Sequence, residues 1–261
     1  MPKIKPADIN INYELEGVGK TVVFINGITM DLHGWDYQVH AFTKHFQVLR
    51  YDCRGQGLTD KPVMEYTHDI HSTDLKYLID ILKINKVSVV GLSNGGMVAL
   101  HFALRYPEMI DKLVLVDTCS YVDTLLSLMI DIWIRATRLG GNEFRYDVTV
   151  PFIFSNNFVT ENTENILKMK EYNLRINDPN AIINLAKACK GHDVSKSIKD
   201  IDIPTLIMVG DQDILIPPRH SEYLHRNIRN SKFIRIDGCG HIPSIEKPEL
   251  FNKTVIEFIR E

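Results

Sequence analysis

The sequence has few cysteines, and they are scattered. Cys53, Cys119, Cys189 and Cys239 form no CxxC motif and no closely spaced pair within the 261 residues. Structural metal sites and the disulfide frameworks of secreted domains need such grouping. The spacing therefore predicts reduced thiols, no bound metal and a cytoplasmic location.

Long apolar runs and an excess of positive charge are also absent. No stretch reaches the roughly 18 uncharged apolar residues of a membrane span, and the apolar run 125–134 is interrupted by Asp131. The first residues, MPKIKPADIN, lack the apolar segment of a secretory signal. The 30 Lys and Arg residues are outnumbered by 33 Asp and Glu, for a net charge of −3. We expect neither a membrane nor a nucleic acid as a partner.

What the sequence does contain is an alternation of apolar strands with amphipathic helices. Such strands, covered on both faces, are typical of a parallel sheet. The apolar strands are expected at 23–26, 48–52, 88–91, 113–117 and 205–210, and helices at 67–83, 95–107, 218–228 and 248–260. Near the N-terminus, 11–17 and 21–27 flank a short turn and predict an antiparallel hairpin.

The strand pattern stops for about 80 residues after Asp117, which is too long for an ordinary loop. This stretch is rich in Leu, Ile and Met at helical spacing. We therefore expect an α/β core formed by 1–119 and 191–261, with a helical cap inserted at 120–190.

The segment GLSNGG, residues 91–96, joins an apolar strand to a helix and has a serine at its centre. A serine hydroxyl needs a base within reach and hydrogen-bond donors for the oxyanion that it creates. A tight strand-to-helix turn projects the Ser93 side chain, aims the backbone N–H of Asn94 at the same place, and needs small neighbours such as Gly91 and Gly95. In this context the G-x-S-x-G pattern predicts a nucleophile.

The acid and base of such a site follow the serine in chain order, acid first. Asp211 and Asp213 come after the predicted strand 205–210, and His241 lies in a glycine-rich loop after the last predicted strand. Each therefore falls at the carboxyl end of a strand, where α/β sheets place their active sites.

These segments together resemble the α/β-hydrolase superfamily, and the similarity covers nearly the whole chain. They are YDCRGQGLTDKP, GLSNGG, VGDQDILIPP and GCGHIPSIEKPELF. The sequence is most similar to the branch of esterases and 3-oxoadipate enol-lactonases with a helical cap. The resemblance implies Asp213 as the triad acid, because Gly210 precedes it in the family's G-x-x-D motif, with Asp117 as the second possible position and Asp211 as a loop-bracing residue.

The resemblance also implies a second oxyanion donor, the backbone N–H of Ile28. The family usually has His-Gly in that loop, whereas this chain has Asn26-Gly27, so Asn26 is expected at most to brace the loop.

The implied function is hydrolysis of a small carboxylic ester or lactone through an acyl-enzyme, without a cofactor. C–C bond hydrolysis, perhydrolysis and a slow-turnover ligand receptor with the same triad remain open. So does the choice between monomer and homodimer. Within the cap, Met129, Trp133, Phe154 and Phe158 are candidates to line an acyl pocket.

One further pattern contains residues that could bind a metal ion. His68-Asp69-x-His71 places two imidazoles at helical i, i+3 spacing, but no further ligand lies near it in the sequence. A metal site is therefore not expected there.

Overall fold

The computed structural model describes residues 3–4 and 8–261. In these residues an eight-stranded sheet has the order β1-β2-β4-β3-β5-β6-β7-β8. The strands are β1 (Lys3–Ile4), β2 (Ile11–Glu16), β3 (Thr21–Ile25), β4 (Gln47–Tyr51), β5 (Val87–Leu92), β6 (Ile110–Val116), β7 (Thr205–Gly210) and β8 (Ser231–Ile236). Strands β3 to β8 pair in parallel, and only β1 and β2 pair antiparallel with their neighbours. The prediction of a mostly parallel sheet is confirmed.

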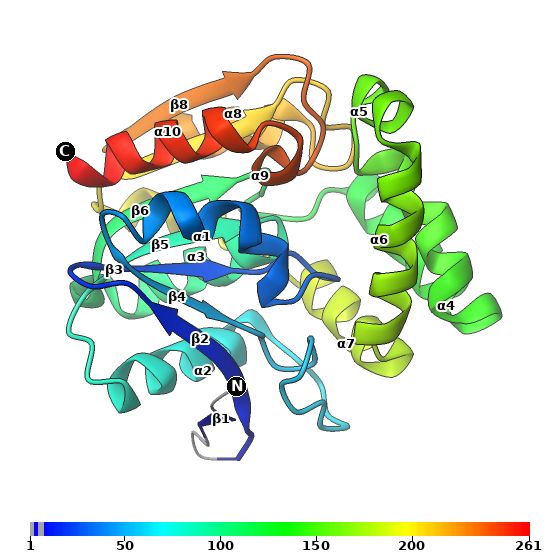
Figure 1. The fold of residues 1–261 in the computed structure, drawn as a ribbon, viewed down its shortest axis with the longest axis horizontal. Helices are drawn as coiled ribbons and strands as arrows, with labels where there is room; N and C mark the ends of the chain where they lie inside the picture. Colours follow the sequence, from blue (N-terminus) through cyan, green and yellow to red (C-terminus); the bar gives the residue numbers. More distant parts are fainter. Residues whose placement is uncertain (1–2, 5–7) are drawn as a thin grey trace.

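Helices cover both faces of this sheet (Figure 1). One apolar cluster joins the sheet to α2, α3 and α8, and a second joins its other face to α1 and α10. These helices are α1 (Asp36–Phe42), α2 (His68–Ile81), α3 (Asn94–Arg105), α8 (Pro218–Asn227) and α10 (Pro248–Arg260). Because both faces are covered, the central strands β3, β5 and β7 are buried at every position.

The predicted N-terminal hairpin is wrong. Strands β2 and β3 do not pair, because β4 lies between them, antiparallel to β2 and parallel to β3. The connection 17–20 crosses the start of β4, where a Cβ at Gly17 would lie 2.4 Å from the Phe46 carbonyl oxygen. Four extended residues reach about 13 Å, enough to cross two strand spacings of about 4.8 Å. A short turn between two strand patterns therefore does not distinguish a hairpin from this crossing.

Four helices occupy the stretch for which a cap is predicted. They are α4 (Thr124–Thr149), α5 (Asn156–Glu161), α6 (Thr163–Ile176) and α7 (Pro179–Lys190). An isolated β-bridge between Tyr121 and Asp193 joins the two ends of this stretch. The four helices gather at one end of the sheet, beyond the carboxyl ends of its parallel strands (Figure 1). In the part of the chain that the structure describes, no helix is long and apolar enough to cross a membrane.

Candidate active site

Ser93 occupies a strained turn between β5 and α3. Its backbone has φ +55° and ψ −119°, a conformation that is rare for a residue with a Cβ. Its N–H donates to the Val116 carbonyl at 2.9 Å, and its carbonyl accepts from the Thr118 hydroxyl at 2.8 Å as well as from the first turn of α3. The turn is therefore fixed by the neighbouring strand β6, and it points the serine side chain away from the sheet edge.

The glycines on either side of Ser93 allow a close approach of three backbone segments. A Cβ at Gly91 would lie 2.4 Å from the Gly95 carbonyl oxygen, and a Cβ at Gly95 would lie 2.2 Å from the Ile25 carbonyl oxygen. Neither position can hold a side chain without moving backbone. The glycines thus bring the end of β3 and its following loop beside the serine.

Asp213 and His241 come together from the loops after β7 and β8. The Asp213 Oδ2 atom lies 2.8 Å from His241 Nδ1, and both residues are almost fully buried. The other carboxylate oxygen of Asp213 accepts backbone N–H bonds from Leu215 and Ile216 at 2.9 and 3.0 Å. These donors hold the carboxylate in place against the histidine. A carboxylate at Nδ1 also fixes the tautomer in which Nε2 of His241 is free to accept a proton.

The two alternative acids lie in different surroundings. Asp211 accepts a hydrogen bond from the Cys239 backbone N–H at 3.2 Å and so braces the loop after β8. Asp117 is fully buried beside Asp213 and accepts from the Gly210 N–H at 2.9 Å. Burial, followed by the negative charge of Asp213, raises the pKa of Asp117 well above its usual range. The neutral form of Asp117 is therefore favoured beside Asp213.

The two backbone groups expected to bind an oxyanion lie on either side of Ser93. Asn94 is the first residue of α3, and Ile28 follows Gly27, whose Cβ position would be 3.8 Å from the Ser93 Cβ. Among the described residues, no group accepts a hydrogen bond from either N–H. Two unengaged donors beside a nucleophile are what an oxyanion needs.

Asn26 and Gln56 of the core both hold the loop that carries Ile28, and the sequence pattern indicated only Asn26. Asn26 donates to the Tyr51 carbonyl at 3.0 Å and accepts from the Trp35 indole at 2.9 Å, so it does brace the loop. Gln56 donates to the Gly27 carbonyl at 2.7 Å. That carbonyl and the Ile28 N–H belong to one planar peptide, so holding the oxygen aims the N–H the opposite way.

Gln56→Met should therefore lower kcat without changing KM. The loop would lose the bond that orients the Ile28 peptide, and we expect a fall of about tenfold, less than for removal of an oxyanion donor outright. Steady-state kinetics on an activated ester measure this. Gln47→Met is the matched control, because Gln47 bonds Thr21 at the amino end of the strands. Equal kinetics for both variants would contradict the role of Gln56.

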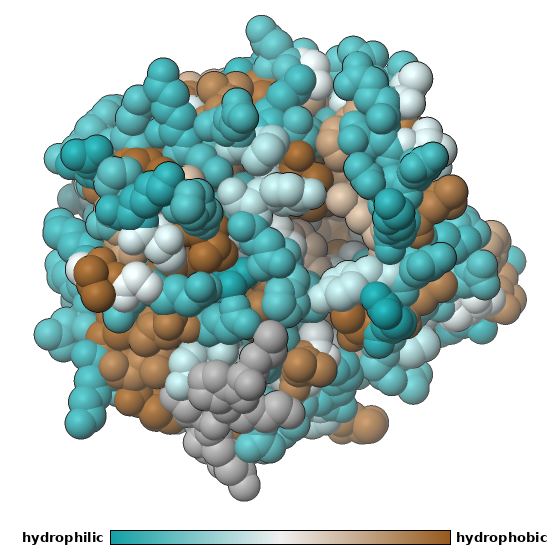
Figure 2. Space-filling model, in the orientation of Figure 1, coloured by the Kyte–Doolittle hydropathy of each residue, from teal (hydrophilic) through white to brown (hydrophobic). Residues whose placement is uncertain are grey.

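A single cavity of about 410 Å³ joins these groups to the cap. Its walls include Ser93, His241 and Ile28 from the core and residues of α4, α6 and α7 from the cap. Figure 2 shows the surface hollowed between the core and the cap helices, with apolar residues inside the recess. Of the predicted pocket residues, Trp133 and Phe154 line the cavity. Met129 packs in the apolar cluster of the cap, and Phe158 stacks on Phe154 at 5.1 Å between ring centroids.

Arg145 is a charged residue in this apolar wall that sequence reasoning missed. It lines the cavity and is 2% exposed. One guanidinium nitrogen donates to the Asn173 side chain, and Nε has no partner among the described residues. No carboxylate in the described part of the chain pairs with it. Burial lowers the pKa of Arg145 only to about 10, so the side chain is a buried, uncompensated cation at neutral pH.

Polar contacts tie the cap to the segment that follows Ile28 and to the loop that carries His241. On α6, the Tyr172 hydroxyl donates to Asp31 at 2.5 Å, beyond the Ile28 loop. The Glu246 carboxylate accepts from the Ser155 hydroxyl at 2.6 Å and from the Gly240 N–H at 3.0 Å, next to His241. These contacts make the cap part of the scaffold that positions the site.

The fold and this site define an α/β hydrolase, and a comparison with protein families agrees. Residues 20–248 match the family model described as the alpha/beta hydrolase fold. The chain belongs to this family.

Individual relatives are more distant. The chain is 24% identical over 241 residues to a protein of Agrobacterium fabrum named as a carbamate hydrolase, covering 92% of each. It is 24% identical over 253 residues to 3-oxoadipate enol-lactonase 2 of Acinetobacter baylyi, covering 95% of this chain and 92% of the relative. Among solved structures, an α/β-hydrolase enzyme from a deep-sea metagenome library superimposes with a TM-score of 0.95 at 31% identity, covering 100% and 98% of the two chains. The enol-lactonase of Burkholderia xenovorans gives a TM-score of 0.94 at 25% identity, covering both chains completely. These similarities support hydrolase activity.

Proposed function

We propose that this protein hydrolyses carboxylic esters or lactones through an acyl-enzyme on Ser93. The observation that carries the proposal is a single cavity that holds the serine, a histidine bonded to a buried carboxylate, and the oxyanion loop. The relatives named as an enol-lactonase and a carbamate hydrolase are consistent with it, because both names denote cleavage at an acyl carbon.

In the proposed reaction, His241 Nε2 takes the proton of the Ser93 hydroxyl as the oxygen attacks the substrate carbonyl. The Ile28 and Asn94 N–H groups bind the resulting oxyanion, and Asp213 stabilises the protonated imidazole. His241 then returns the proton to the leaving alkoxide. A water molecule, deprotonated by the same imidazole, hydrolyses the acyl-enzyme and releases the acid.

The substrate class follows from Arg145. A buried guanidinium is stable only with a compensating partner, and this one has neither an acidic neighbour nor a full set of acceptors. An anionic group on the substrate, such as a carboxylate, would supply both the charge and the acceptors. Much of the rest of the wall is apolar, including Trp133, Ile134 and Phe154, which fits a short hydrocarbon between that group and the scissile carbonyl. We therefore assign the cavity to an ester or lactone that also carries a carboxylate.

Two esters of nearly equal size test this assignment. Mono-p-nitrophenyl succinate has a terminal carboxylate where p-nitrophenyl butyrate has a methyl group. The wild-type protein should turn over both and prefer the succinate in kcat/KM. Arg145→Gln should reduce kcat/KM for the succinate by about 100-fold, the value of a charge-assisted pair of about 2–3 kcal/mol, and leave the butyrate nearly unchanged.

Lys168→Gln is the matched control, because Lys168 is an exposed cation on the same cavity wall. If Lys168→Gln instead lost the preference for the succinate, Lys168 at the rim of the cavity would be the residue that binds the carboxylate. An equal loss on both esters in Arg145→Gln would contradict carboxylate binding. Failure of the wild-type protein to turn over either ester, with stoichiometric fluorophosphonate labelling of the serine, would contradict the hydrolase proposal and favour a ligand receptor.

A further inference from the structure

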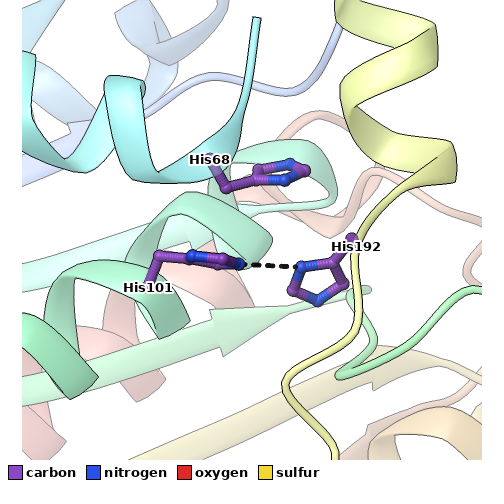
Figure 3. A group of neighbouring side chains, drawn as sticks. All are labelled: His68, His101 and His192. Atoms are coloured by element: carbon purple, nitrogen blue, oxygen red, sulfur yellow. Dashed lines mark hydrogen bonds between the residues drawn. The ribbon is translucent and has the colours of Figure 1, made fainter.

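Three histidines from distant parts of the chain meet beside the nucleophile turn. His68 begins α2, His101 lies within α3, and His192 follows the end of α7 (Figure 3). One nitrogen of each ring lies within 4.8 Å of the corresponding nitrogens of the other two. His68 and His192 are only 2% and 3% exposed, while the His101 side chain is 18% exposed. The cluster is thus buried with one side open to solvent.

The hydrogen bonds of two rings fix where their protons are. His101 Nδ1 lies 2.9 Å from the Asp69 carboxylate, and His192 Nε2 lies 3.0 Å from the Cys119 carbonyl oxygen. Both oxygens are acceptors, so both nitrogens carry hydrogen. A neutral imidazole has one N–H. Neutral His101 and His192 therefore direct bare lone pairs at each other, from Nε2 and Nδ1, across 3.3 Å (Figure 3).

The third ring has the same arrangement. His68 Nε2 lies 3.0 Å from the side-chain oxygen of Asn94, which also accepts from the Cys189 thiol. A donor at Nε2 leaves the lone pair of His68 on Nδ1. Each of the three rings thus donates its single N–H to a protein acceptor, and each retains a lone pair. A cation shared by the three rings would satisfy these lone pairs together.

A proton is a poorer occupant than a metal ion. A proton on His101 Nε2 can be donated to one neighbour, so it would satisfy His192 and leave the lone pair of His68 unmatched. A metal ion, in contrast, can accept the lone pairs of all three rings at once.

We propose that His68, His101 and His192 form a binding site for a divalent transition-metal ion of the zinc type. With metal–nitrogen bonds of about 2.0–2.1 Å, two ligands of a tetrahedral ion lie about 3.3–3.4 Å apart, which is the separation of the His101 and His192 nitrogens. A nitrogen of His68 lies within 4.8 Å of both, so this ring has to move closer to complete the set. Three imidazoles suit zinc, copper or nickel and not the oxygen-preferring calcium or magnesium. The partly exposed side of His101 leaves the fourth position to water.

The hydrogen bonds made by the ring nitrogens that face away from the cluster are those that a metal-binding histidine requires. A ligating imidazole usually donates its other N–H to a carboxylate or a backbone carbonyl, which fixes the tautomer and aims the lone pair. Asp69 does this for His101, and the Cys119 carbonyl does it for His192. The sequence pattern His68-Asp69-x-His71 thus contained one ligand and one outer partner. His71 is buried one helical turn away and lies outside the group.

Titration of the metal-free protein with Co²⁺ at neutral pH tests the site without any assay of catalysis. We expect one ion per chain, visible absorption bands typical of a four- or five-coordinate nitrogen site, and displacement by Zn²⁺. Binding should also raise the Tm in proportion to the logarithm of metal concentration. His101→Gln should weaken binding by at least about 100-fold, and Asp69→Asn, which removes only the outer partner, by about 10- to 100-fold.

Two control variants locate the ion. His225→Gln changes an exposed histidine on α8, and His241→Gln removes the imidazole of the other cluster of ligand-type side chains, formed with Asp117 and Asp213. Both should bind Co²⁺ like the wild-type protein. Loss of binding in His241→Gln, unchanged binding in His101→Gln, or no Co²⁺ bound by the folded wild-type protein would each overturn the proposal. None of these outcomes depends on whether the protein hydrolyses esters.

Discussion

Ser93→Ala should abolish ester hydrolysis while leaving the fold intact. We expect kcat to fall by a factor on the order of 10⁵–10⁶, because the acyl-enzyme cannot form and only binding and the oxyanion donors remain. The variant should also lose labelling by a fluorophosphonate probe. Alanine retains a Cβ, so the strained turn, with φ +55°, stays as it is and the Tm should change little.

A matched serine distinguishes loss of the nucleophile from loss of a buried hydroxyl. Ser120 is also buried, follows the neighbouring strand β6, and does not line the cavity. Ser120→Ala should keep wild-type kcat and full labelling. Hydrolysis by Ser93→Ala at more than a small fraction of the wild-type rate, after removal of contaminating esterases, would mean that another group attacks the carbonyl.

The positions of Ser93, Asp213 and His241 were predictable because each depends on a local pattern. A run of apolar β-branched residues predicts a strand, and the small or acidic residue that follows the run marks the carboxyl end of that strand. Parallel strands align these ends at one edge of the sheet. Sequence order alone thus placed Ser93 and His241 on one cavity and Asp213 against the histidine.

Features that depend on pairing between distant segments were not predictable in this way. The N-terminal hairpin prediction failed because β4, which begins at residue 47, inserts between β2 and β3. Gln56 and Arg145 look like ordinary polar residues until the fold places one against a peptide oxygen and the other in an apolar wall. The histidine cluster likewise gathers side chains separated by up to 124 residues. No rule based on the spacing of residues along the sequence predicts such contacts.

The Asp213 and Asp117 pair provides the second large effect, because Asp213 is the acid that is hydrogen-bonded to His241. Asp213→Asn should lower kcat by about 10⁴-fold. An amide at this position can offer an N–H to His241 Nδ1, which then becomes the acceptor and moves the hydrogen to Nε2. The imidazole would then present a donor to Ser93 and could not act as a base. The loss should be smallest at high pH, where a larger fraction of serine is ionised without help.

Asp117→Asn should behave differently, although the two carboxyl groups are neighbours and both are buried. Burial, followed by the charge of Asp213, raises the pKa of Asp117 and favours its neutral form, which an amide resembles, and the amide oxygen can still accept from the Gly210 N–H. We expect kcat within about tenfold of the wild-type value and a similar Tm. Measured kcat/KM between pH 5 and 9 for both variants separates the roles. A loss of the same size in both would show that Asp117 also takes part in catalysis, and the reverse ranking would assign the triad carboxylate to the loop after β6 instead of the loop after β7.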